Sequence, residues 1–249
     1  MERIDHIIIK AGDLHAAVMD FKDVGFEVYY GTKKEKAYNA LVYLQDHCML
    51  ELVKTTAIPA LARILTKWGV FRFISPIYNR LGNFYFKEGP FIDYPVHSTN
   101  IEHFHERVKD QSSKLKTNAK RKKPNGVTVH WKCFMPKNLD FPFVITDYEP
   151  EKISADETNI QPNGIKGIQK LKVGVADQMD SFQEELIRFY TIGEDCIDKV
   201  HDGFNVKTAN ATVEYRKSDK NKVHRIVLYP FDQNVNQKLG KYGITTAAV

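Results

Sequence analysis

Polar side chains recur at alternate positions of three short apolar segments. They are His6 in the first segment, Asp93 and His97 in the second, and Lys170 and Lys172 in the third. Successive residues of a β-strand point to opposite faces, so in each segment these side chains share the face that lies away from a packed helix. Such a face must line either water or a ligand cleft. The sequence therefore predicts functional residues on the free faces of its sheets.

Glu51 is a second candidate for chemistry because it stands in the apolar run MLEL. A carboxylate among apolar neighbours is suited to act as a general base. The alternative is a carboxylate that is simply paired with a lysine such as Lys10, and the sequence leaves both open.

Histidines also gather near the second segment, at positions 97, 103 and 105. His103 and His105 are two residues apart and cannot share one helical face, which argues against a metal pair carried by a helix.

The elements that must position these residues follow a repeating order. Residues 5–28, 92–115 and 169–192 each predict a strand, a polar cap and an amphipathic helix, with the caps at Asp13, Asn100 and Asp177. Further strands are predicted after each helix, at 38–44 and 49–53, at 127–134 and 141–146, and at 209–216 and 223–229. The repeating unit is βαβββ, and three copies of it predict an α+β fold.

Less regular segments separate the copies. Residues 54–91 predict a helix over 58–68 followed by an aromatic segment at 68–86, which is either a lid over an apolar pocket or an insertion packed on the sheet or at a dimer contact. The run 113–126 predicts a solvated basic loop. The predicted organisation is paired modules over 1–148 (1–53 and 92–148), a linker at 149–167, a third module at 168–232 and a tail at 233–249.

These segments, in this order, resemble the vicinal oxygen chelate superfamily, which includes glyoxalases, bleomycin resistance proteins and dihydroxybiphenyl dioxygenases. The resemblance is to its glyoxalase-like branch. It rests on DHIIIKAGDLHAAVMDFKDVGF at 5–26, YNALVYLQDHCMLEL at 38–52, PNGVTVHWKCFMP at 124–136, FPFVITDY at 141–148 and QPNGIKGIQKLKVGVAD at 161–177. It implies that two of the modules form one cup-shaped mixed sheet.

The resemblance also implies a divalent metal ion in the cup, held by the first and last strands of each module. In the first module the matching residues are His6 and Glu51, and this residue pair suits a hard or borderline divalent ion. In the second module the matching positions fall on Asp93 and within 142–144, with His130 as a possible substitute. The alternative is a hydrogen bond between His6 and Glu51 in a polar cup without metal.

Four residues are candidates for contact with a substrate: Asn39, His130, Trp131 and Phe143. Asn39 could donate to a substrate oxygen or satisfy strand-edge groups. His130 and Trp131 are adjacent and must face opposite ways, so one should line the cup and the other should pack in the core.

The resemblance implies an enzyme that uses a divalent metal ion as a lyase, isomerase or dioxygenase on a small organic molecule. The alternative is a non-catalytic small-molecule binder, comparable with drug-sequestering members of the superfamily. A homodimer is expected from the family and from the unpaired third module.

Composition excludes several other classes. The chain has 249 residues, 36 Lys and Arg against 31 Asp and Glu, and a net charge of +5, which is weak evidence for a nucleic-acid partner. The basic run at 114–123 lacks an aromatic residue for base stacking. Three widely spaced cysteines, no signal peptide and no charge-free span predict a cytoplasmic protein without a membrane partner.

Overall fold

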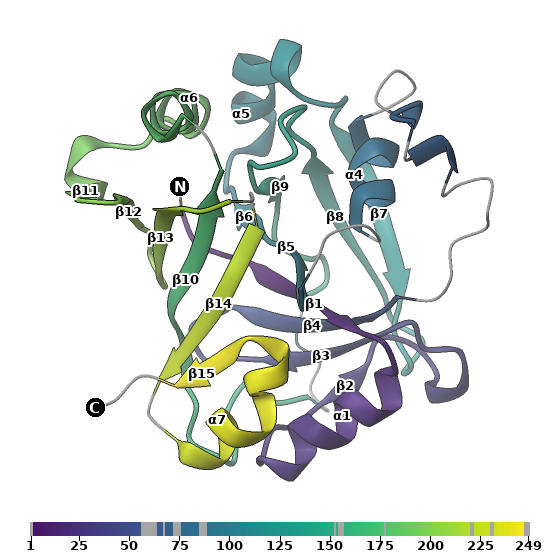
Figure 1. Cartoon of the computed structure of the whole chain (residues 1–249). Helices are drawn as coiled ribbons and strands as arrows, with labels where there is room; N and C mark the ends of the chain where they lie inside the picture. The colour runs from purple at the N-terminus through teal and green to yellow at the C-terminus, as the bar shows by residue number, and fades with distance from the viewer. Residues whose placement is uncertain are drawn as a thin grey trace.

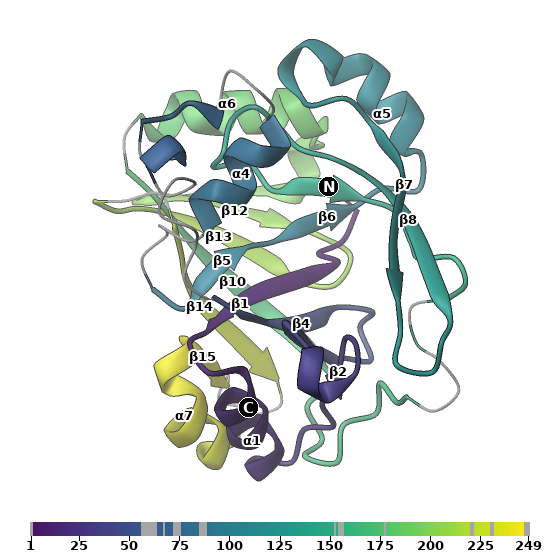
Figure 2. The same cartoon turned by 90° about the vertical axis from the view of Figure 1, so that its right-hand side faces the viewer.

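The computed structural model describes residues 2–55, 64–66, 68–71, 76–84, 89–151, 153, 157–176, 178–219, 222–229 and 232–246. In these residues the chain builds three mixed sheets with helices packed against them (Figures 1 and 2). The predicted α+β class is confirmed, and the order of strands within each sheet shows how the polar faces are positioned.

The first sheet has the strand order β2-β3-β4-β1-β5, in which β1 runs parallel to β4 and antiparallel to β5. One helix, α1, connects β1 to β2, and Asp13 caps it by accepting hydrogen bonds from the backbone N–H groups of His15 and Ala16. The elements are β1 (His6–Ala11), α1 (Leu14–Asp23), β2 (Tyr29–Tyr30), η1 (Lys34–Lys36), β3 (Asn39–Tyr43), β4 (Met49–Lys54) and β5 (Phe91–Asp93).

The second sheet repeats the arrangement with the order β6-β9-β8-β7, and β6 again runs parallel to the last strand, β9. Asn100 caps its helix as predicted, by accepting from the N–H of His103. The elements are β6 (Pro95–His97), α5 (Ile101–Val108), η2 (Lys109–Gln111), β7 (Lys116–Lys122), β8 (Thr128–Phe134) and β9 (Phe143–Ile145).

The third sheet has six strands in the order β11-β12-β13-β10-β14-β15. Its first strand, β10, is parallel to β13, and the helix α6 lies between β10 and β11 in sequence. The elements are β10 (Gly167–Val175), α6 (Met179–Tyr190), η3 (Glu194–Cys196), β11 (Ile197–Val200), β12 (Gly203–Lys207), β13 (Thr212–Lys217), β14 (Lys222–Tyr229), α7 (Gln233–Leu239), η4 (Gly240–Tyr242) and β15 (Ile244–Thr246). The predicted cap Asp177 lies outside the described residues.

The first two sheets meet along β1 and β6. Ile4 forms an antiparallel bridge with Val96, the N–H of Asp5 donates to the carbonyl of Pro95 (3.1 Å), and the N–H of His97 donates to the carbonyl of Arg3 (2.8 Å). The two first strands are therefore neighbours, and the faces that carry His6 and His97 adjoin each other.

One core serves all three sheets. As predicted from the alternation, the side chains on one face of each first strand are buried in it: Ile7 and Ile9, Tyr94 and Val96, and Leu171 and Val173. The hydroxyls of Tyr94 and Tyr215 join the second and third sheets at 2.9 Å. The third sheet thus packs on the helix-bearing side of the other two and leaves their opposite faces for other contacts.

The turn between β12 and β13 also holds the start of the chain. The amide side chain of Asn210 accepts from the N–H of Ile4 and donates to its carbonyl, each at 2.9 Å. The N–H of Ala209 donates to the carbonyl of Glu2 at 2.7 Å. Residues 2–4 are therefore fixed directly in front of His6 by a distant part of the chain.

Three segments differ from the prediction. The expected loop at 113–126 contains strand β7. In this edge strand the side chain of Ala119 is buried, whereas the lysine side chains are exposed to solvent. The expected tail forms α7 and β15, with β15 parallel to β14. The aromatic segment contains a helix that was not predicted, α4 (Pro76–Phe84).

The expected linker packs rather than spans open solvent. Gln161 donates to the carbonyl of Tyr43 and accepts from the N–H of Glu27, and Asn163 donates to the carbonyl of Val24. Within the described residues, no helix is both long enough and apolar enough to cross a membrane.

Candidate functional site

His6 opens strand β1 on the face away from the core and is almost fully buried, with 4% of its surface exposed. Its Nδ1 lies 2.6 Å from Oδ1 of the buried Asp5, and its Nε2 lies 3.5 Å from Oε2 of Glu51. A carboxylate can only accept, so the Nδ1 atom carries the hydrogen of the first contact. The same hydrogen bond orients the ring so that Nε2 faces Glu51.

Glu51 projects from β4 and is held by Asn39 of β3, which donates from Nδ2 to Oε1 at 2.5 Å. The strand register explains the meeting, because Glu51 pairs with Leu41 on one side and with Ile8 of β1 on the other. Asn39 is fully buried, and its Oδ1 has no hydrogen-bond partner among the described residues. The structure thus brings together the predicted His6, Glu51 and Asn39.

Phe143, another predicted contact residue, lies beside this group. Its ring on β9 meets the His6 imidazole edge-on, with 5.9 Å between the centroids. Phe143 also belongs to a small apolar cluster with Ile8, Ile92 and Met135, separate from the main core. The candidate site therefore has polar groups on the first sheet and an apolar wall from the second.

Asp93 does not join the site as the metal ligand that the sequence alignment suggested. It accepts two hydrogen bonds from Arg80 of α4, from Nε at 2.5 Å and from Nη2 at 2.7 Å, and both side chains are buried. Its two oxygens are therefore engaged in a buried ion pair. No role was predicted for Arg80, which is one of two arginines in the aromatic segment.

The second sheet carries a histidine–carboxylate pair of its own. In the first sheet His6 pairs with Met49, and Glu51 follows two residues later. In the second sheet His97 pairs with Ile145, and Asp147 follows two residues later. Its Oδ2 lies 3.0 Å from Nε2 of His97.

This pair was not predicted, because the helix caps match His6 with Asp93. His6 stands seven residues before its cap, and His97 stands three before its own.

Trp131 and His130 take opposite sides of β8, as expected for adjacent residues. Trp131 packs on Tyr148, with 5.0 Å between the centroids, in a cluster with Ala119, Cys133 and Ile145. His130 is exposed and its backbone pairs with Glu149, so the structure places it away from the predicted site.

Tyr148 connects the Trp131 cluster to the acids of the first sheet. Burial, and then the neighbouring carboxylates of Asp5 and Glu51, raise the pKa of the Tyr148 hydroxyl well above its usual value. The hydroxyl is therefore neutral in the physiological range.

The model of the glyoxalase-like domain family matches residues 4–189 of this sequence. The chain belongs to the glyoxalase-like domain family. The matched segment contains both histidine–carboxylate pairs and the first two sheets. A search of the curated proteins found none that matches this glyoxalase-like chain.

Several solved structures match nearly the whole length of this chain in fold. A hypothetical protein from Staphylococcus aureus has a TM-score of 0.67 at 14% identity, over 99% of this chain and 98% of that one. BphC, a halotolerant catechol dioxygenase, has a TM-score of 0.53 at 8% identity, over 97% and 74%. A mutant of 4-hydroxymandelate synthase from Streptomyces coelicolor has 0.51 at 9%, over 97% and 75%. These likenesses establish the vicinal oxygen chelate fold.

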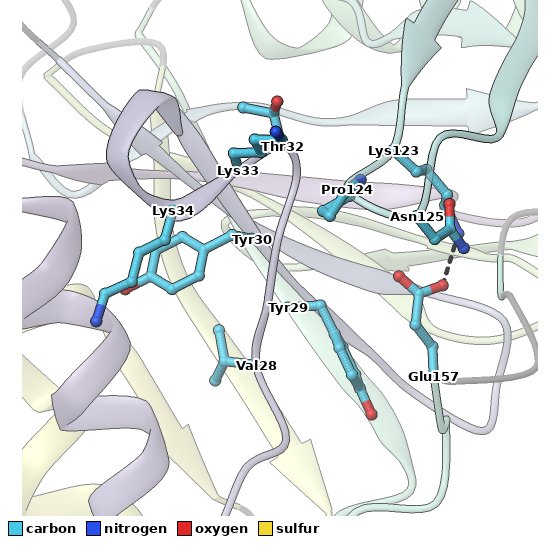
Figure 3. Close-up of a pocket in the computed structure, with 10 residues that line it drawn as sticks. All are labelled: Val28, Tyr29, Tyr30, Thr32, Lys33, Lys34, Lys123, Pro124, Asn125 and Glu157. Carbon is cyan, nitrogen blue, oxygen red and sulfur yellow. Dashed lines mark hydrogen bonds and ion pairs between the residues drawn. The ribbon is translucent and has the colours of Figure 1, made fainter.

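The glyoxalase-like chain also has a pocket of ≈ 280 Å³ at the far edges of its first two sheets (Figure 3). Its wall comes from residues 28–34 and from the turn between β7 and β8. There Lys123 is buried and paired with Glu157 at 2.6 Å. The pocket holds none of the predicted site residues.

The aromatic segment is described only in part. Phe71 and Tyr78 lie 6.5 Å apart between ring centroids, and Trp68 and Tyr78 are exposed. Phe73, Tyr85 and Phe86 lie outside the described residues, so the lid and the packed insertion both stay predictions. Within the described part of the chain, no group of three or more His, Cys, Asp or Glu side chains is placed to hold a metal ion.

Proposed function

We propose that this glyoxalase-like protein is an enzyme that acts on a small organic molecule at the face carrying His6 and Glu51, with a divalent metal ion held by these two residues. The observation that carries the proposal is the 3.5 Å approach of His6 Nε2 to Glu51 Oε2, with Asp5 fixing the other side of the imidazole. Two electron-rich atoms that face each other at this distance need a positive charge between them.

The donor set fits a metal ion. Nitrogen and oxygen ligands about 2.1 Å from one ion, at a tetrahedral angle, are about 3.4 Å apart. Metal-bound histidines commonly donate their second N–H to a carboxylate, which is the position that Asp5 takes. Asn39 occupies Oε1 of Glu51 and leaves Oε2 toward His6. A proton shared between His6 and Glu51 is the competing explanation of the same geometry.

A bound divalent ion would polarise an oxygen of the substrate and stabilise negative charge that develops on it. His6 and Glu51 would orient that oxygen, and Phe143 would exclude water from one side. Glu51, with Asn39 bound to one oxygen, is placed to accept a proton as a general base. A lyase, an isomerase and a dioxygenase all use these functions, and the proposal extends to that group of reactions.

The test is elemental metal analysis of protein purified without chelator or metal-affinity resin. We expect near-stoichiometric divalent metal in the parent, its loss in the His6→Ala, Glu51→Ala double variant, and retention in His130→Ala, which removes an exposed histidine. A parent that holds no metal even after soaking with Mn²⁺, Ni²⁺ or Zn²⁺ would end the metalloenzyme proposal.

A non-catalytic small-molecule binder is the second candidate. It is favoured because no group of three or more His, Cys, Asp or Glu side chains among the described residues is placed to hold a metal ion. Stoichiometric binding without turnover, unchanged by metal, would support it over the enzyme.

We also propose a cytoplasmic homodimer. The three cysteines are free, which suits a reducing compartment. Sedimentation equilibrium measures the oligomeric state.

A further inference from the structure

A buried guanidinium group lies at the wall of the candidate site. Arg80 is 2% exposed, and three of its five N–H donors have acceptors: Nε–H and one Nη2–H bind Asp93, and the other Nη2–H binds the carbonyl of Phe141 at 2.6 Å. Its Nη1 is buried and has no hydrogen-bond partner among the described residues. Because a buried charged donor without an acceptor is costly, it is expected to meet an acceptor in the functional state.

The strand register links Arg80 to Glu51. Ile8 of β1 pairs with Glu51 on one side and with Asp93 on the other, so these three residues form a row across β4, β1 and β5. Neighbouring strands are about 4.8 Å apart, which places the backbone of Glu51 about 10 Å from that of Asp93. Asp93 is the residue to which Arg80 is hydrogen-bonded.

One aromatic ring contacts both His6 and Arg80. Arg80 Cζ is 5.6 Å from the centroid of Phe143, and the His6 ring is 5.9 Å from the same centroid. Ile8, Ile92 and Met135 pack with Phe143 and make the surface between them apolar. A molecule with an apolar body that reaches His6 with one end can therefore reach Arg80 with the other.

The free donors of Arg80 favour an oxygen acceptor on such a molecule. Nη1 offers directed N–H donors on a charged group, and these bind a carboxylate more strongly than a neutral oxygen. Arg121 of β7 lies on the same side as Ala119, makes no ion pair with any of the described residues, and has a buried Nε without a partner among them. It adds a positive charge to this side of the second sheet.

We propose that Arg80 is the anion-binding residue of this face and that the ligands are small organic acids with an apolar body, whose carboxylate accepts from Nη1. The inference rests on the proposed use of the His6–Glu51 face as the ligand site. It assigns a binding role to α4, which the sequence alignment left without one.

The experiment compares acids with their uncharged amides on the full chain. The probes are 3-phenylpropanoate with 3-phenylpropanamide and hexanoate with hexanamide, titrated by calorimetry. We expect each acid to bind the parent at least tenfold more tightly than its amide. The Arg107→Gln variant, which changes an exposed arginine on α5, should keep this preference.

The decisive variant is Arg80→Met with Asp93→Leu, because it removes the ion pair without leaving a buried charge unpaired. A second variant, Arg80→Lys, keeps a cation beside Asp93 but removes the guanidinium fork. We expect both to lose the preference for acids while thermal unfolding shows that they are folded.

Two results would overturn the inference. One is equal or unmeasurable binding of acid and amide by the parent, and the other is a preference that survives in the double variant. Metal content measured on the same samples separates the two proposals, because it depends on His6 and Glu51 and not on Arg80.

Discussion

Each of the first two sheets carries a histidine–carboxylate pair, and the two pairs differ in how the carboxylate is held. Glu51 is only 16% exposed in its side chain, accepts from the buried Asn39 and keeps one oxygen toward His6. Asp147 is 71% exposed, and Arg3 binds its other oxygen at 2.5 Å.

The carboxylates behind the two histidines also differ in their exposure. His6 is backed by the buried Asp5, whereas His97 is backed by Glu2, which is 43% exposed and also accepts from Thr99. Two pairs of the same residue types therefore have different surroundings. Burial and a fixed amide partner hold the first pair, whereas Arg3 and solvent surround the carboxylate of the second.

The largest difference is expected when each acid is removed in turn. Glu51→Ala should weaken Mn²⁺ or Ni²⁺ binding at least about 100-fold because it deletes a direct ligand, whereas Asp147→Ala should change it less than about twofold. Isothermal titration calorimetry measures both. Equal losses in the two variants would show that the pairs act together at one ion.

The next difference concerns the groups behind the histidines. Asp5→Asn should cost about 10- to 100-fold in affinity for the ion, since Asp5 fixes the His6 ring through Nδ1. The matched change at the second pair, Glu2→Gln, should leave ion affinity unchanged. Isothermal titration calorimetry measures the ion affinity of both variants. Equal losses in Glu2→Gln and Asp5→Asn would contradict a specific role for Asp5 behind His6.

A smaller effect is expected from a glycine that contacts Asn39. A Cβ on Gly31 would lie 2.0 Å from Oδ1 of Asn39, so Gly31→Ala must displace the amide that holds Glu51. We expect a loss of about tenfold in ion affinity, because removal of a residue that orients a metal ligand typically costs about 10- to 100-fold. Gly12→Ala is the control, since a Cβ there has no atom within 4 Å among the described residues. Unchanged affinity in Gly31→Ala would mean that Asn39 does not set the position of Glu51.

The smallest effect should follow removal of the side chain that connects the two pairs. Arg3 contacts Asp5 at 3.4 Å and Asp147 at 2.5 Å near the surface. Arg3→Gln should lower the free energy of unfolding by about 1 kcal/mol, because its partner Asp147 is exposed and the buried Asp5 keeps its contact with His6. Urea unfolding measures it, with Lys132→Gln, which removes another exposed pair, as the control.

The α+β class and the His6–Glu51 part of the site could be predicted from the sequence, because both follow from local patterns. The alternation in β1 and the caps at Asp13 and Asn100 are encoded by neighbouring residues, and Glu51 follows from the strand that pairs with β1. His97 and Asp147 were not paired, because their relation depends on the length of β6 and its register with β9.

Two further features that were not predicted have physical explanations. The basic run that contains Arg121 was predicted as a loop because edge strands tolerate lysine as loops do. Arg80 was overlooked because its role depends on Asp93, which pairs with it only when α4 packs over β5. Contacts between distant elements of this kind leave no local pattern.

The contacts of Asn210 with Ile4 have a consequence for the order in which the protein matures. The two residues are 206 positions apart, so the chain must be synthesised almost to β13 before the residues in front of His6 find their partners. Contacts this distant form late because much of the chain must be ordered before they can close. On the ribosome, we expect α1 and its neighbouring strands to fold early, whereas Glu2, Arg3 and Asp5 reach their final positions only after Asn210 has been made. A nascent chain halted in the second sheet would therefore carry His6 and Glu51 before their supports are in place.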